Sequence, residues 1–121
     1  YMKAWDKNIP ESLAEGILDD VTYDWLSVVE GIMESGGDVV VVTEDYIKEA
    51  YKISRKSGYN VSATGTAGLA GLMKLMKEKK ITEGEKIGLL FTGIDRRKNI
   101  RKDLSQNVVT LNSKDLIDKI L

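Results

Sequence analysis

The sequence predicts an α/β fold, a three-layer sandwich in which a mostly parallel sheet of three to four strands is flanked by helices. Short apolar runs alternate along the chain with segments of helical periodicity, which is typical of parallel strands joined by right-handed crossovers. Residues 39–42 are four consecutive valines, a pattern that suits a strand buried on both faces. The 121 residues are enough for one domain, 1–121, with a sizeable core.

The amino-terminal third of the chain predicts one irregular segment and one helix. Residues 1–12 have mixed polarity and no periodicity, so we expect an irregular stretch, cut from a longer chain or left after removal of a tag. Residues 19–35 carry apolar side chains at helical spacing, and Gly36 and Gly37 end that helix. The valine run at 39–42 is the first predicted strand.

A second helix is expected between Thr43, its N-cap, and Gly58, with Glu44 and Asp45 favourably placed in its first turn.

The remainder of the chain continues the alternation. Residues 60–63 predict a short strand and residues 65–79 a helix. Residues 86–91 and 108–111 predict two further strands, and a last helix begins near Asn112. The inner faces of the two central helices should enter the core: Ile47, Ala50, Tyr51, Ser54, Leu69, Leu72, Met73 and Met76.

Composition excludes several kinds of chemistry. The chain has no Cys and no His, so it has neither a thiolate nucleophile nor a serine–histidine pair, and we expect no metal site. A net charge of −1 gives no reason to expect binding to nucleic acid or to a membrane. No apolar run is long enough to span a bilayer and no signal peptide is visible, so we expect a cytoplasmic protein.

The most informative feature is a glycine-rich run, residues 61–72, followed about twenty residues later by the run 89–93. Each half reads as a strand that ends in hydroxyls and glycines, and ligands of parallel α/β proteins bind at such strand ends. Gly65, Gly68 and Gly71 are evenly spaced by three, which matches neither the phosphate loop nor the dinucleotide fingerprint. Close packing of a small-residue helix and a ligand against the helix start both remain open.

Thr92 and Gly93 also have two interpretations. They are consistent with a strand that simply leaves the sheet. Alternatively, a hydroxyl at this position can form a hydrogen bond to a ring nitrogen without requiring that nitrogen to carry a proton.

Four pieces of the chain, read in order, resemble the pyridoxal-phosphate enzymes of the tryptophan synthase β type (fold type II), and the threonine synthases most closely. They are Ser12–Ile17, Trp25–Gly37, Val41–Ile47, and the pair formed by Ser62–Leu72 with Leu89–Gly93. The resemblance covers residues 13–94. It implies that the domain is part of a larger one.

The resemblance implies pyridoxal phosphate as cofactor and a cofactor wall in this chain. Thr92 would face the pyridine nitrogen, Gly93 would leave room for the ring, and Ser62, Thr64 and Gly65 would line the same wall. The family's cofactor-binding lysine and phosphate loop resemble no segment here. We therefore expect no catalytic residue in this chain, which would be a fragment that binds the cofactor weakly or not at all.

Two departures from the family pattern concern the same strand ends. Ser62-Ala63 stands where the family often has Glu-Pro, and Thr-Gly-Ile-Asp replaces the commoner Thr-Gly-His-Gly, which bears on the geometry of that loop.

The resemblance further implies a reaction, the conversion of O-phosphohomoserine and water to threonine and phosphate. A threonine dehydratase or another pyridoxal-phosphate ammonia-lyase is the first alternative, and a cofactor-free α/β binding domain is the second. The expected partners are the remainder of a parent chain, a small amino-acid substrate and further copies of the protein.

Overall fold

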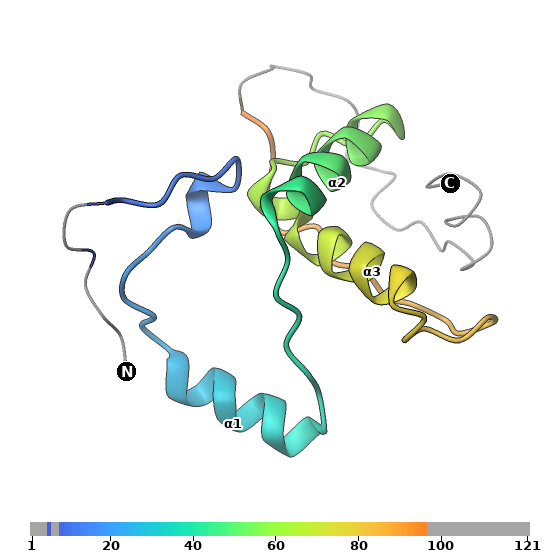
Figure 1. Ribbon diagram of the computed structural model, residues 1–121, viewed down its shortest axis with the longest axis horizontal. Helices are drawn as coiled ribbons and strands as arrows, with labels where there is room; N and C mark the ends of the chain where they lie inside the picture. The colour runs from blue at the N-terminus through green and yellow to red at the C-terminus, as the bar shows by residue number, and fades with distance from the viewer. Residues whose placement is uncertain (1–4, 6–7, 97–121) are drawn as a thin grey trace.

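The computed structural model describes Trp5 and residues 8–96. In this part of the chain the regular elements are helical (Figure 1). In chain order they are η1 (Glu15–Ile17), α1 (Trp25–Ser35), α2 (Glu44–Lys56), η2 (Thr64–Thr66) and α3 (Ala67–Lys77).

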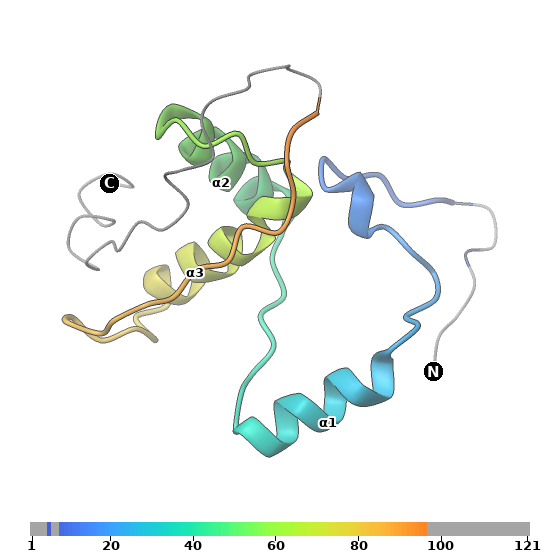
Figure 2. The same cartoon turned by 180° about the vertical axis from the view of Figure 1, so that it is seen from behind.

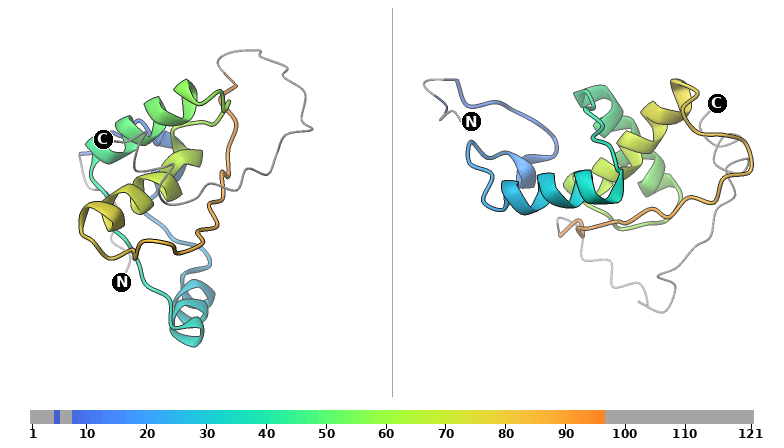
Figure 3. Two further views of the ribbon diagram at one scale, coloured as in Figure 1. Left: turned by 90° about the vertical axis from the view of Figure 1, so that its right-hand side faces the viewer. Right: turned by 90° about the horizontal axis from the view of Figure 1, so that it is seen from below.

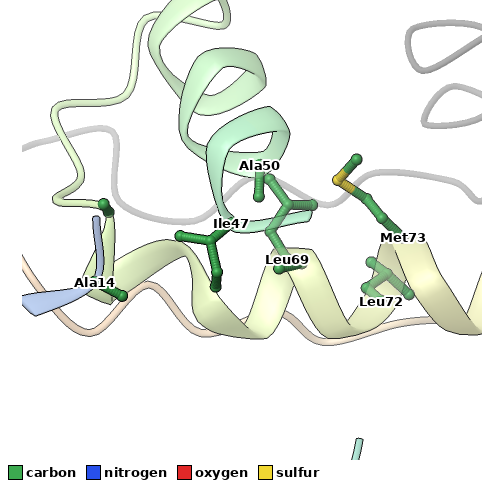
Figure 4. Packing of buried hydrophobic residues seen from close by; sticks show 8 residues of the cluster. Ala14, Ile47, Ala50, Leu69, Leu72 and Met73 are labelled. Carbon is green, nitrogen blue, oxygen red and sulfur yellow. The ribbon is translucent and has the colours of Figure 1, made fainter. Parts of the chain in front are cut away.

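The core lies between α2 and α3, which are the two helices that pack most extensively on each other. Ile47 and Ala50 of α2 meet Leu69, Leu72 and Met73 of α3, as Figure 4 shows. Ala14, next to η1, closes the amino-terminal end of this cluster. Both helices form because apolar residues recur along one side of each, so that burial of that side stabilises the helix.

The inner faces that the sequence predicts for α2 and α3 are confirmed. Ser54 is buried as well, and its hydroxyl donates to the Tyr51 carbonyl one turn earlier, which satisfies it inside the core. Tyr51 and Met76 are half-buried at the edge of the cluster.

Helix α1 stands away from the α2–α3 core in Figure 1 and in the left view of Figure 3. None of its residues is buried, although its apolar residues lie on one side. It begins at Trp25, six residues later than the sequence predicts. It ends as predicted at Gly36, whose φ of +66° is the left-handed conformation that glycine adopts without strain.

The predicted three-layer sandwich with a parallel sheet is wrong. Within the described residues, 39–42, 60–63 and 86–91 form no strand, and Val61 and Ile94 form an isolated antiparallel bridge. The strand expected at 108–111 and the last helix lie outside the described residues.

The physical reason is that the runs 39–42 and 86–91 pack on helix α3. A Cβ placed on Gly71 of α3 would lie 3.8 Å from the Cβ of Val40, and one placed on Gly68 would lie 3.4 Å from a methyl of Leu89. The Lys74 ammonium donates to the Val41 carbonyl at 2.7 Å, which satisfies an acceptor that a neighbouring strand would otherwise use.

Residues 86–95 run along α3 from its carboxyl end back to its start (Figure 2). Exposure alternates along this segment. Ile87, Leu89, Phe91, Gly93 and Asp95 are half-buried or buried, whereas each residue between them is exposed. The segment therefore shows the period of two that predicts a strand, but the inner side of the segment faces helices.

The amino-terminal segment is held to the start of α2 by Glu44. Its carboxylate accepts hydrogen bonds from the Ser12 hydroxyl at 2.7 Å and from the Leu13 backbone N–H at 2.8 Å. The bond from Leu13, then that from Ser12, and the nearby Lys48 charge lower the pKa of Glu44 below its usual value.

Among the described residues, the helices are too short and insufficiently apolar to cross a membrane.

The buried face of α3 and the exposed face of α1 can be compared by the same substitution. We expect Leu69→Ala to lower the free energy of unfolding by about 3 kcal/mol, because it leaves a cavity between α2 and α3. Leu26→Ala, at a side chain that is 53% exposed, should change it by less than about 0.5 kcal/mol. Urea unfolding followed by circular dichroism measures both, and equal losses would contradict the placement of α1 outside the core.

The pKa of Glu44 predicts a dependence of stability on pH. Because this pKa is lower in the folded chain, Glu44 stabilises the fold above its usual value of 4.5, and the contribution is lost as the pH falls through the lower folded value. Wild type should exceed Glu44→Gln in stability near neutral pH, and the difference should shrink below about pH 5. Ser12→Ala removes one of the two hydrogen bonds and should show a smaller effect of the same sign. A constant difference from neutral to acidic pH would exclude this account.

Candidate functional site

The candidate site is the place where the two glycine-containing runs meet, at the start of η2. The Ser62 N–H donates to the Gly93 carbonyl at 3.1 Å, and the Asp95 N–H donates to the Asn60 carbonyl at 3.1 Å. These two bonds flank the Val61–Ile94 bridge. The structure therefore brings together the two halves that the sequence pairs, by an antiparallel contact and not at parallel strand ends.

The closest approach in this site is between Gly65 and Gly93. A Cβ on Gly65 would lie 2.6 Å from the Gly93 nitrogen, 2.8 Å from its carbonyl oxygen and 2.8 Å from a Val61 methyl. A Cβ on Gly93 would lie 2.5 Å from the Ser62 hydroxyl oxygen. A Cβ at Gly65 would require the Gly93 backbone to move, whereas a Cβ at Gly93 would require the Ser62 hydroxyl to move, so both positions favour glycine. Close packing explains these glycines directly.

The other predicted site residues differ in what their hydroxyls do. Ser62 Oγ accepts from the Gly65 N–H at 3.1 Å and so fixes the first turn of η2. Thr64 Oγ1 accepts from the Gly16 N–H at 3.2 Å and joins η1 to η2. Thr92 is exposed, and its hydroxyl has no hydrogen-bond partner among the described residues. Of the three hydroxyls, that of Thr92 is the most available to a ligand.

The buried Thr66 fixes the backbone conformation of the site. Its hydroxyl donates to the Ala63 carbonyl at 2.7 Å, and its backbone N–H donates to the carbonyls of Ser62 and Ala63. These bonds tighten the chain into the 3₁₀ turn that precedes α3. The turn places Ser62 and Gly65 on the side where residues 93–95 pass.

A buried polar cluster around Asp95 holds the chain two residues beyond Gly93. Asp95 is 4% exposed, and its carboxylate accepts from the Tyr51 hydroxyl at 2.6 Å. Arg55 lies 3.9 Å from the same carboxylate and also donates to the Asn60 side-chain oxygen. Asn60 in turn donates to the Asp95 carbonyl at 3.3 Å. The charge of Asp95 is thus buried with a cation and hydrogen-bond donors, as a buried carboxylate requires.

This cluster around Asp95 was not predicted from the sequence. The signal for it was the alternation of residues 87–95, which continues for one more step and puts Asp95 on the inner side. An acidic residue at an inner position predicts hydrogen-bond or ionic partners from a neighbouring helix. The carboxyl-terminal half of α2 provides Tyr51 and Arg55.

Among the described residues, no group of three or more acidic side chains lies close enough together to hold a metal ion.

Comparison with known proteins gives relatives of one class, enzymes of amino-acid biosynthesis. They are threonine synthases. That of Methanocaldococcus jannaschii is 34% identical to the chain over 85 residues, which are 69% of this chain and 21% of the relative. Those of Bacillus sp. (strain ULM1) and Mycobacterium leprae are 31% and 29% identical over the same length, 24% of each relative. Neither a family model nor a solved structure matches the chain.

The chain is therefore related to threonine synthases over about two thirds of its length, and it spans between a fifth and a quarter of the length of these relatives. This relationship is the one that the four resembling segments predict. The assignment of Thr92, Gly93, Ser62, Thr64 and Gly65 to a cofactor wall stays a prediction.

The contact between Gly65 and Gly93 predicts a large effect of one methyl group. Gly65→Ala should lower the free energy of unfolding by about 2 kcal/mol or more, since the new Cβ must displace the Gly93 backbone. Gly31→Ala is the matched control, because a Cβ there meets nothing within 4 Å and alanine favours a helix by about 1 kcal/mol over glycine. Thermal unfolding measures both changes. Similar effects of the two substitutions would show that the backbones do not touch.

Proposed function

We propose that this chain is part of a threonine synthase-like enzyme that uses pyridoxal phosphate to convert O-phosphohomoserine and water into threonine and phosphate. The observation that carries the proposal is the 34% identity over 85 residues to the threonine synthase of Methanocaldococcus jannaschii. Two further threonine synthases at 31% identity over the same length support it.

The residues of the site suit a flat, nitrogen-containing ring at one point. Thr92 presents an exposed hydroxyl on the outer side of its segment, where a ring can approach it. A hydroxyl donates one proton to an unprotonated ring nitrogen and carries no charge. Pyridoxal phosphate, when bound, withdraws electrons from the amino-acid substrate. An uncharged partner at its ring nitrogen moderates that withdrawal.

In this proposal the remaining residues act mainly by fixing the position of Thr92. Ser62 binds the Gly93 carbonyl through its N–H, and Gly65 contacts the Gly93 backbone directly. The Tyr51–Asp95 hydrogen bond holds the chain three residues beyond Thr92. Thr64 of η2 accepts from the Gly16 N–H and so holds η1 against η2. The Ser62 hydroxyl still has its proton to donate, because its oxygen is the acceptor for Gly65.

The cofactor-binding lysine, the phosphate site and the substrate site would be supplied by the remainder of a parent chain. This follows from the resemblance and agrees with the share of each relative that the chain covers. The proposed partners of the residues described here are thus the parent chain, the cofactor and a small amino-acid substrate.

The test uses the protein encoded by the complete reading frame that contains this chain. We expect it to release inorganic phosphate from O-phosphohomoserine with threonine as the second product. Thr92→Val should lower the turnover number about 10- to 100-fold, as expected for the loss of one hydrogen bond worth about 1–3 kcal/mol, and Thr92→Ser should restore most of it.

Thr82→Val is the matched control, because Thr82 is exposed in a turn of the described chain and should leave turnover unchanged. Release of ammonia from threonine in place of phosphate release would indicate a dehydratase. A reading frame without a lysine that binds the cofactor would exclude the whole class.

A further inference from the structure

Asp95 breaks the pattern of the alternating segment to which it belongs. The other inner residues of this segment are Ile87, Leu89, Phe91 and Gly93, all uncharged, whereas Asp95 adds a carboxylate and is only 4% exposed. Burying a charged group costs free energy even when the group is paired, and apolar residues in its place are often neutral or stabilising. Stability alone therefore does not explain an acidic residue at this position.

The apolar residues of the segment do not decide strongly which side faces inwards. Large apolar side chains also lie on the outer side, where Leu90 is 77% exposed and Ile94 is 55% exposed. In a segment with a period of two, a shift by one residue turns every side chain to the other side. Because both sides carry apolar residues, the apolar pattern specifies the register weakly, and a shift by one residue would turn Thr92 inwards.

The contact at Gly93 holds two backbones together but restricts the register only in part. A Cβ in the place of Gly93 would first meet the Ser62 hydroxyl, at 2.5 Å, whereas the Gly65 nitrogen lies 3.6 Å away. This hydroxyl is the end of a side chain and can rotate, at the cost of its hydrogen bond from the Gly65 N–H. The Ser62–Gly93 hydrogen bond joins two backbone groups, which neighbouring residues also have.

Asp95 specifies the register by directional bonds. Its carboxylate accepts from the Tyr51 hydroxyl of α2 at 2.6 Å, and Arg55, one turn further along α2, lies 3.9 Å from it. Asn60 binds the Asp95 backbone twice, because it accepts from the N–H at 3.1 Å and donates to the carbonyl at 3.3 Å. A shift by one residue would put an isoleucine or an arginine in this place, and neither side chain can accept a hydrogen bond from Tyr51.

We propose that Asp95 is a positioning residue that selects, through Tyr51, the register in which the Thr92 hydroxyl faces outwards. Thr92 lies three residues before Asp95, so the two side chains are on opposite sides of the segment in this register. The buried carboxylate contributes specificity at a cost in stability, as buried polar groups do in some other proteins. That the outward hydroxyl meets a cofactor rests on the proposed function, whereas the selection of the register does not.

The first test removes the Tyr51–Asp95 pair without leaving one partner buried alone. Tyr51→Phe with Asp95→Leu replaces both partners by apolar groups of similar size. We expect this double variant of the 121-residue chain to have a melting temperature within about 4 °C of the wild type or above it. Tyr23→Phe with Asp24→Leu is the matched control, because it makes the same chemical change at two exposed positions.

A thiol introduced at one position reports which side of the segment is accessible, because the chain contains no Cys. Thr92→Cys places the thiol on the outer side, and Leu89→Cys places it on the inner side, against α3. In the wild type and in the matched control, dithionitrobenzoate should label position 92 about 30-fold faster than position 89. Without the Tyr51–Asp95 pair this ratio should fall below about threefold, because a second register exposes position 89. A ratio that stays near its wild-type value would overturn the proposal.

Two single variants decide the question if the double variant does not fold. Asp95→Asn keeps an oxygen that accepts from the Tyr51 hydroxyl, and it should keep most of the labelling ratio. Tyr51→Phe removes that bond and should lower the ratio. Equal ratios in the two variants, or the opposite order, would contradict a register selected through Tyr51.

The complete enzyme tests whether the register acts through Thr92. Removal of the Tyr51–Asp95 pair should lower the turnover number about tenfold, but less than about threefold in an enzyme that already carries Thr92→Val. Effects that multiply in the two backgrounds would mean that the pair does not act through Thr92, and the proposal would then be wrong. If the wild-type enzyme releases no phosphate, the proposed function fails, while the labelling ratio still decides the role of Asp95 in the register.

Discussion

The contact of Gly65 with Gly93 is the constraint on which the described fold depends. It is a contact between two backbones, with a Ser62–Gly93 hydrogen bond beside it, and neither backbone can move without the other. Because η2 leads directly into α3, this contact also fixes the start of α3 and hence the face that α3 presents to α2. At its other end the same segment is held by the buried Asp95, whose partners come from α2 and Asn60. Thr92 therefore lies immediately before two residues whose positions are fixed, Gly93 and Asp95, which is the kind of support that a binding residue requires.

The sequence predicted those parts of the fold that depend on neighbouring residues. The inner faces of α2 and α3 follow from apolar residues three and four positions apart, and the end of α1 at Gly36 follows from glycine's freedom at positive φ. The parallel sheet was wrong because the valine run at 39–42 indicates a preference for an extended backbone but does not say what it packs on. In the structure Val40 lies against Gly71 of α3, and a helix takes the place that the sequence analysis gave to neighbouring strands.

The candidate site was predicted in part for the same reason. That the Ser62 and Gly93 segments come together was visible in their matching composition, and their spacing left packing and ligand binding as two possible reasons. The distances now favour packing for Gly65 and Gly93 and leave the exposed Thr92 hydroxyl as the group that faces outwards. The cluster of Asp95 with Tyr51 and Arg55 could not be read from spacing, because Asp95 comes 40 or more positions after these two residues of α2.

Helix α1 is joined to the rest of the chain by two non-helical connections, and its side chains add nothing to the buried core (Figure 1). Its sequence is therefore released from the demands of folding that act on Leu69 or Ile47. The chain thus has two regions on which folding places different demands: residues 44–95, which supply most of the buried core, and residues 25–35, which supply none of it.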